Sequence, residues 1–199
     1  MIIKLSPVRL EVQLSVARLG DVLTINGLAL DFEMLPEGAS LPASAVGSPD
    51  VLDPIERREG KLFICLRLPF GADAPQDARF PADIIDPADG LILLPGSQHS
   101  HEQKAESAGV IDWSQMVTAE MKQEAAAAQH LAAVQADAAA RRAAADSAIA
   151  PLQDAVDIDD ATDAEVLALK AWKKYRVALN RLPEQPGYPT DIDWPAPPA

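Results

Sequence analysis

Residues 162–183 read TDAEVLALKAWKKYRVALNRLP, and this stretch decides the fold of the second half of the chain. It begins with a capping box, in which the hydroxyl of Thr162 accepts a hydrogen bond from the backbone N–H of Glu165 and the Glu165 carboxylate bonds back to Thr162. One apolar stripe follows at helical spacing: Ala168, Trp172, Tyr175, Leu179 and Leu182. Acidic residues at the start and basic residues toward the end complement the helix dipole, and Pro183 stops the helix. The stretch therefore predicts an amphipathic helix that ends at residue 182.

Before this helix, residues 113–150 predict a longer one, because strong helix formers fill the segment and it contains no proline. Its apolar stripe has the spacing of a coiled coil but mostly small members: Leu131, Val134, Ala138, Arg141, Ala145, Ala148 and Leu152. Such a face buries little alone, so we expect it to pack against a second helix, from this chain or through self-association with another copy. A short connection at 157–162 favours an antiparallel hairpin over 113–182, with Trp172 and Tyr175 across the alanine face.

The segment 183–199 is rich in proline, which bars regular structure and favours an extended chain. Three large side chains within it, Tyr188, Ile192 and Trp194, are costly to leave in water. They either fold back on the predicted hairpin or bind another protein, and the sequence leaves both alternatives open.

Residues 1–95 have a different pattern, in which short β-type segments alternate with turn signals. The clearest predicted strand is 8–18, where apolar and polar residues alternate strictly. The other predicted strands are 22–25 and 28–32 on either side of an Asn26-Gly27 turn, 55–57 and 61–68 around a second turn, and the short segments 83–85 and 91–94. Such a series predicts an antiparallel β-sandwich or small barrel. Polar residues 96–112 are predicted as a linker, so the whole chain is of the α+β class.

Two groups of residues could have a chemical role, as a reactive thiol or as a metal site. Cys65 is the only cysteine, so no disulfide within the chain is expected, and its apolar strand context favours a buried structural thiol. His99 and His101 resemble half of a metal site, but structural zinc needs four ligands, so a solvated linker is the better interpretation.

A third group, the acidic run at 157–163, resembles a calcium loop. It has Ala161 at a ligand position and Thr162 in place of the turn glycine, and helix capping explains its acids. The sequence contains no glycine-rich phosphate loop and no nucleophile elbow. We therefore expect no enzymatic activity, no metal and no cofactor.

The formal net charge of −13 argues against binding to nucleic acid and to anionic membranes, since both attract basic proteins. No apolar run is long enough to span a bilayer, and the start of the sequence lacks a secretory signal, so the expected location is the cytoplasm. Within this acidic chain, residues 170–181 form a basic stretch. It is either a solvated helix face or a docking face for an acidic protein surface.

Four blocks at matching spacing carry a resemblance: Leu152-Gln153-Asp154-Ala155-Val156-Asp157, Ala161-Thr162 with Glu165, the run from Trp172 to Arg181, and Asp191-Ile192-Asp193-Trp194-Pro195. Together they resemble the phage tail fibre assembly proteins. The resemblance is strong over about fifty residues, and the alanine-rich helix from about residue 113 fits it less specifically.

The resemblance implies a chaperone that binds the C-terminal, receptor-binding end of a tail fibre and assists its folding and trimerisation in the host cytoplasm, with retention on the virion in some members. The alternative is a permanent virion component at the fibre tip or baseplate. Region 1–95 is expected to supply a separate interaction surface. The residues predicted to bind the fibre are Trp172, Lys173, Tyr175, Arg176, Arg181, Ile192 and Trp194.

Overall fold

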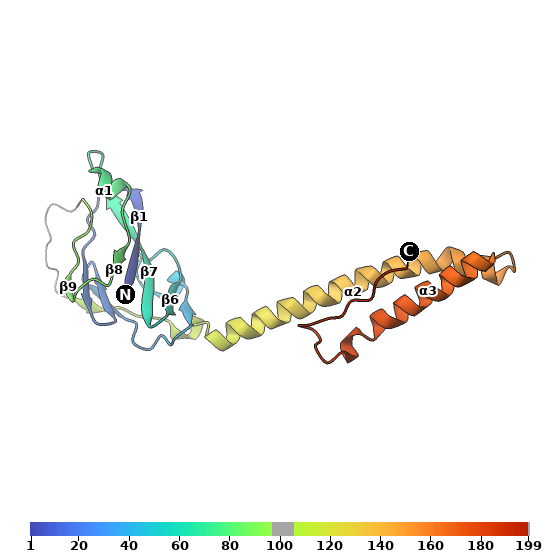
Figure 1. Cartoon of the computed structure of the whole chain (residues 1–199). Helices are drawn as coiled ribbons and strands as arrows, with labels where there is room; N and C mark the ends of the chain where they lie inside the picture. Colours follow the sequence, from blue (N-terminus) through green and yellow to red (C-terminus); the bar gives the residue numbers. More distant parts are fainter. Residues whose placement is uncertain (97–105, 199) are drawn as a thin grey trace. The chain divides into compact units, whose positions relative to one another are not determined.

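A computed structural model describes residues 1–96 and 106–198, and the chain divides into two compact units (Figure 1). Unit 1 comprises Met1–Lys122 and unit 2 comprises Gln123–Ala199. The predicted linker histidines, His99 and His101, lie outside the described residues. None of the helices in the described ranges is long and apolar enough to cross a membrane.

Unit 1 is built from two five-stranded sheets. The first has the order β5-β6-β7-β1-β8, with bounds Ser40–Leu41, Ile55–Arg58, Lys61–Phe70, Ile2–Arg9 and Ile84–Ile85. The second has the order β10-β4-β3-β2-β9, with bounds Ser107–Ala108, Leu28–Asp31, Val22–Ile25, Val16–Leu19 and Gly90–Leu91. Two short helical segments, a 3-10 turn at Ala43–Ala45 and α1 at Gln76–Arg79, lie in the connections.

The two sheets share one hydrophobic core. Ile3 of β1 and Leu66 of β7 are buried in the same cluster as Leu23 of β3 and Leu30 of β4. The predicted α+β class with a β-sandwich is confirmed, and the described strands do not close into a barrel. Most pairings are antiparallel, but β1–β7 and β10–β4 are parallel. Parallel neighbours need a long crossover, and the chain between β1 and β7 supplies it by visiting the second sheet.

The predicted continuous strand 8–18 is wrong. β1 ends at Arg9 in the first sheet and β2 begins at Val16 in the second, so residues 10–15 cross between the sheets. Leu10 and Val12, which the alternation placed on a buried face, are 38% and 60% exposed. Alternation shows which side chains share a face, but it does not show that a neighbouring strand lies beside the segment.

Both predicted hairpin turns are confirmed. Asn26 and Gly27 join β3 to β4 with φ of 49° and 82°, and Glu59 and Gly60 join β6 to β7 with φ of 52° and 72°. Two successive positive φ angles match the right-handed twist of the flanking strands. Cys65 is buried in β7 as predicted, and burial raises the pKa of its thiol to about 11.

Residues 106–118 belong to unit 1, although the sequence placed most of them in a linker. β10 pairs with β4, Ile111 bridges to Val46, and Val117 bridges to Ser40. Asp112 caps a 3-10 turn at Trp113–Gln115 through the Ser114 amide, not the long helix. Because Val117 is extended against Ser40, helix α2 begins only at Ala119 and runs to Asp157, whereas the sequence placed its start near residue 113.

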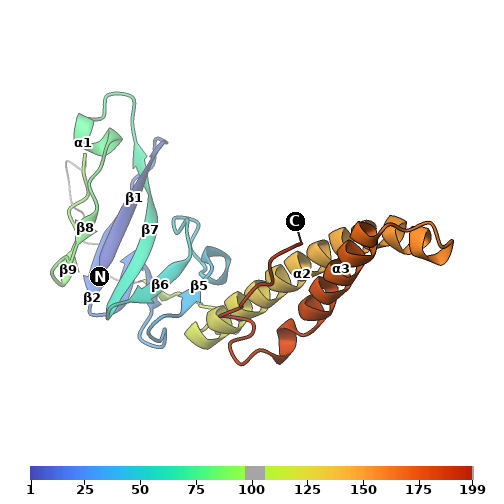
Figure 2. The same cartoon turned by 45° about the vertical axis from the view of Figure 1, so that its right-hand side comes forward.

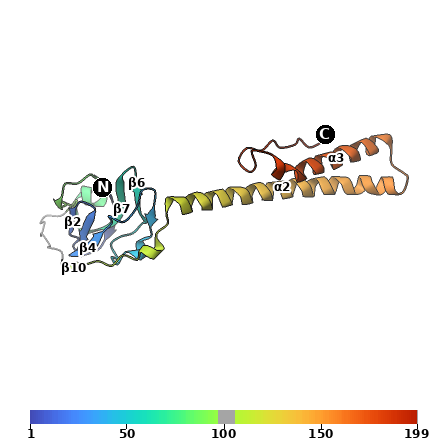
Figure 3. The same ribbon diagram turned by 90° about the horizontal axis from the view of Figure 1, so that it is seen from below.

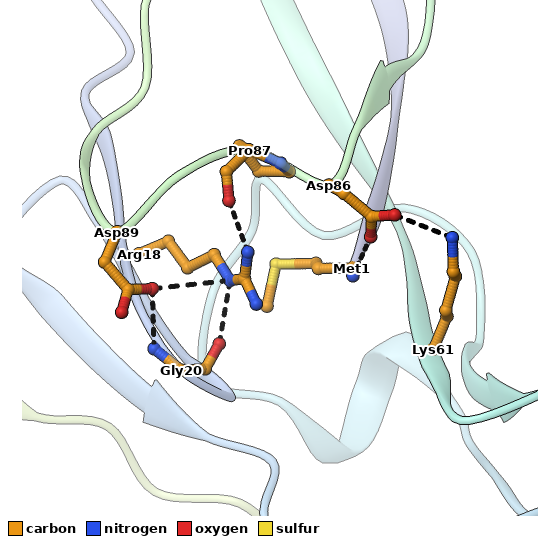
Figure 4. A network of polar contacts seen from close by, with 7 residues as sticks. All are labelled: Met1, Arg18, Gly20, Lys61, Asp86, Pro87 and Asp89. Carbon is orange, nitrogen blue, oxygen red and sulfur yellow. Dashed lines mark hydrogen bonds and ion pairs between the residues drawn. The ribbon is translucent and has the colours of Figure 1, made fainter.

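A polar network ties the loop after β8 to both sheets (Figure 4). The Asp86 carboxylate accepts from the amino group of Met1 at 2.8 Å and from Lys61 Nζ at 2.6 Å. Arg18 of β2 donates to the carbonyl oxygens of Pro87 and Gly20. The hydrogen bonds from Lys61 and the amino terminus lower the pKa of Asp86 to about 2. The loop is thus fastened to β1, β7 and β2.

Candidate protein-binding surface

The hairpin of unit 2 depends on the cap of helix α3, Asp163–Asn180. Thr162 Oγ1 accepts from the Glu165 amide at 3.3 Å, and Glu165 Oε2 accepts from the Thr162 amide at 2.7 Å, so the predicted capping box is confirmed. These bonds to Thr162 lower the pKa of the Glu165 carboxyl. The cap begins α3 six residues after α2 ends, which turns the chain back beside α2 (Figure 3).

Small residues of α2 receive the large residues of α3. Ala138 and Ala145 are buried in one cluster with Tyr175, Leu179 and Leu182. Trp172 packs against this cluster and meets Tyr175 edge-on, with ring centroids 5.8 Å apart and planes at 80°. The predicted packing of Trp172 and Tyr175 on the alanine face is confirmed. Alanine allows this because a larger side chain would hold the two helices apart.

Polar contacts fix the register of the two helices. Arg176 Nη1 of α3 lies 2.7 Å from Asp146 Oδ1 of α2, and Lys173 donates to the side-chain oxygen of Gln153. Both cations were predicted to bind a partner. In the structure they join α3 to α2. A single exposed ion pair such as Arg176–Asp146 contributes on the order of 0–1 kcal/mol.

The tail folds back on the hairpin, which was one of the two alternatives left open by the sequence (Figures 1 and 2). Tyr188, Ile192 and Trp194 pack against the Tyr175 cluster. The guanidinium carbon of Arg141 lies 4.4 Å from the centroid of the Trp194 ring, a cation–π contact. Arg141 interrupts the apolar stripe of α2 because it serves as the platform for this tryptophan.

Backbone and side-chain hydrogen bonds stabilise this folded-back conformation of the tail. The Gln185 side chain donates to the Asp193 carbonyl oxygen and accepts from the Asp193 amide, each at 2.9 Å. His130 Nε2 lies 3.0 Å from the Pro189 carbonyl oxygen. A Cβ at Gly187 would collide with the backbone of Asp191, so the turn there requires glycine.

The seven residues predicted to bind a partner fall into two groups. Tyr175 is 6% exposed, and Trp172, Lys173, Arg176, Ile192 and Trp194 are half-buried in contacts within unit 2. Arg181 alone among them is exposed. Contact of all seven with a partner stays a prediction. The six residues other than Arg181 hold the hairpin and the tail together.

The opposite side of α3 carries a surface that the prediction only partly included, and we call it the outer stripe. Its members are exposed and recur at helical spacing: Leu167, Lys170, Lys174, Val177 and Arg181. Leu167 is 69% exposed and Val177 is 45% exposed. Within the described residues the three cations make no ion pair and no side-chain hydrogen bond, in contrast to Arg176. The helical periodicity of the sequence that places Tyr175 on the inner face of α3 also places these residues on its outer face.

The described residues hold no cluster of histidine, cysteine, aspartate or glutamate side chains that could bind a metal ion. The calcium-like run at 157–163 serves instead as the connection between α2 and the Thr162 cap.

A family model described as "Caudovirales tail fibre assembly protein, lambda gpK" matches residues 89–199, which is more than half of the chain. The chain belongs to this tail fibre assembly family. The match begins at β9, so the family region includes β9, β10 and the pairing segments before α2 as well as the hairpin and tail.

Three relatives from this family are 54–56% identical to the chain over 48–50 residues. They are the prophage tail fiber assembly protein homolog TfaR of Escherichia coli K12, the tail fiber assembly protein of Escherichia phage lambda, and a probable tail fiber assembly protein of Acyrthosiphon pisum secondary endosymbiont phage 1. The aligned segment spans about a quarter of this chain and 24–31% of each relative. No solved structure matches the chain.

Proposed function

We propose that this chain is a tail fibre chaperone, which binds the C-terminal, receptor-binding end of a phage or prophage tail fibre and assists its folding and trimerisation in the host cytoplasm. The observation that carries the proposal is the family match over residues 89–199, which includes all of unit 2. The names of these relatives refer to tail fibre assembly, which agrees with the proposal.

The outer stripe of α3 is the proposed contact with the fibre. It combines exposed Leu167 and Val177 with Lys170, Lys174 and Arg181, three cations that have no ion-pair partner in the described part of a chain whose net charge is −13. An apolar centre with charged neighbours is typical of protein interfaces, and the cations favour an acidic fibre surface. Ile192 and Trp194, half-buried on the tail, are a second proposed contact, separate from the outer stripe. Trp172, Lys173, Tyr175 and Arg176 position α3 for binding.

A chaperone is useful to trimeric β-rich fibres for a physical reason. Their chains make many contacts between residues far apart in sequence, so they fold slowly. Strand edges stay unpaired until three chains come into register, and such edges pair readily with wrong partners. A protein that covers the fibre end stoichiometrically, without nucleotide, prevents this misassociation.

Co-expression tests the proposal. A candidate partner tail fibre is produced with and without the chain, and soluble trimer is measured by size-exclusion chromatography with light scattering. We expect insoluble or monomeric fibre alone and soluble trimer with the chain. Unchanged solubility and trimer yield would contradict the chaperone role. If the chain is instead a stoichiometric part of purified particles and leaves fibre folding unchanged, the permanent virion component is the correct assignment.

A further inference from the structure

A pocket of about 350 Å³ opens in unit 2 where three segments meet. Helix α2 contributes Gln135 and Arg142, the end of α3 contributes Leu179 and Asn180, and the following chain contributes Leu182 and Tyr188. Leu179 and Leu182 are buried and form an apolar floor. The other four side chains carry hydrogen-bonding groups, and one of them carries a positive charge.

Arg142 is the unusual member of this pocket. It is half-buried, and its Nε donates to the Ala138 carbonyl oxygen of its own helix at 3.2 Å. Among the described residues no carboxylate forms an ion pair with it. Its neighbour Arg141 is paired with Asp137 at 3.2 Å, and Arg176 is paired with Asp146 at 2.7 Å. A partly desolvated cation without a counter-ion is unfavourable, so Arg142 is a site that gains from an incoming anion.

We propose that this pocket binds a carboxylate of a partner protein, with the adjoining apolar part of the partner resting on Leu179 and Leu182. The planar guanidinium of Arg142 has donors left beyond Nε, and arginine binds carboxylates through paired hydrogen bonds. Gln135, Asn180 and Tyr188 supply further donors for a peptide segment. The pocket shares no lining residue with the outer stripe and does not require the partner to be a fibre.

The charge of the pocket favours a carboxylate over a phosphate group. Among the described residues that line it, Arg142 is the only cation, and the whole chain has a net charge of −13. A single positive charge matches a monoanion, whereas phosphate-binding sites usually combine several cations or backbone amides. The pocket floor is also apolar, and a carboxylate at the end of a peptide or on a side chain carries an apolar neighbour that can cover it.

Nuclear magnetic resonance of the full chain tests the proposal directly. The Arg142 Nε–H signal is assigned by its loss in Arg142→Gln and is followed during titration with four probes. N-acetyl-leucine supplies a terminal carboxylate, N-acetyl-glutamate amide supplies a side-chain carboxylate, N-acetyl-leucinamide is the uncharged match, and inorganic phosphate supplies a different anion. We expect a saturable shift with at least one carboxylate probe and about tenfold weaker binding of the uncharged match.

The Arg141 Nε–H signal is the internal control, because Arg141 is already paired with Asp137 and stacked on Trp194. It should shift little in the same titrations. The variants Arg142→Lys and Arg142→Gln both lack the Arg142 Nε–H, so their binding is followed by the side-chain amide signal of Asn180, which also lines the pocket. Arg142→Lys, which keeps the charge, should bind the carboxylate probe more tightly than Arg142→Gln does. Equal shifts with the carboxylate and amide probes, or saturation by phosphate alone, would overturn the inference. Which carboxylate probe binds better identifies a chain terminus or an acidic side chain as the source.

Discussion

Trp194 is joined to the hairpin through a cation–π contact and through apolar packing. Its ring lies under Arg141 and against the Tyr175 cluster, so it links the end of the tail to both helices. We predict that Trp194→Ala destabilises unit 2 by about 1–3 kcal/mol, through the lost cation–π contact and lost apolar burial. Urea unfolding followed by circular dichroism at 222 nm measures this. Leu167→Ala, at an exposed site of α3, should change stability by less than about 0.5 kcal/mol, and equal effects would show that Trp194 contributes nothing to the fold.

Asp86 makes unit 1 sensitive to acid. Its pKa is about 2 in the folded chain and near 3.8 without its partners, so it binds a proton more readily when unfolded. Its contribution is therefore present above about pH 4 and is lost as the pH falls toward 2. We predict that Asp86→Asn lowers the melting temperature of unit 1 at pH 6, and that the difference from the native chain closes near pH 2. The control variant is Asp73→Asn, because Asp73 is an exposed carboxylate without an ion pair in the described chain. Its melting temperature should differ little from that of the native chain at either pH.

At the scale of elements, the close approach of α2 and α3 depends on a methyl group. Ala145 is fully buried against Tyr175 and Leu179, whereas its neighbour Ala144 is exposed. We predict that Ala145→Leu destabilises the hairpin by about 1–3 kcal/mol by overpacking, although leucine is a good helix former. Ala144→Leu adds the same side chain on the outside and should be nearly neutral in the same urea experiment. A neutral Ala145→Leu would mean that the helices do not pack as the structure shows.

The cap of α3 provides a second prediction, on the stability of a single helix. The hydroxyl of Thr162 accepts a hydrogen bond from one of the free backbone amides at the helix start. Thr162→Ala removes this bond and should lower the stability by about 1 kcal/mol. Thr162→Ser keeps the hydroxyl and should keep most of the stability. The folded pKa of Glu165 is lowered, so its contribution is present at neutral pH and is lost as the pH falls through that lowered pKa. Chemical unfolding of the two variants at pH 7 and at acidic pH measures both effects, and equal losses for alanine and serine would contradict the cap.

Local features were predictable because they depend on residues near one another in sequence. The Thr162 cap, the Asn26-Gly27 turn and the alanine face opposite Tyr175 all follow from spacing alone. The break in 8–18 was not predictable, since it depends on which sheet each half of that segment joins. The pairing of Arg176 with Asp146 likewise depends on the register of α3 on α2, thirty residues back along the chain. A basic run in sequence therefore could not reveal which of its charges were free.

For the whole molecule, the decisive question is which side of α3 faces the fibre. The inner side of α3 is occupied by α2 and the tail, so the fibre contact that we propose for α3 uses the outer stripe. We predict that Lys170→Glu with Lys174→Glu leaves the fold intact, weakens fibre binding at least tenfold at low salt, and removes most of the gain in soluble trimer on co-expression. Binding by the native chain should also weaken as salt is raised, because exposed charges are screened.

The control for that experiment matches the change in net charge. Lys4→Glu with Arg9→Glu also replaces two exposed cations by two anions, but on β1 of unit 1. If long-range repulsion were the cause, both double variants would weaken binding equally. If the outer stripe makes the contact, only the α3 variant loses fibre binding, as measured by surface plasmon resonance. Loss in the unit 1 variant alone would instead move the contact to the β-sandwich, and the tail fibre would then be held by the part of the chain that precedes the family region.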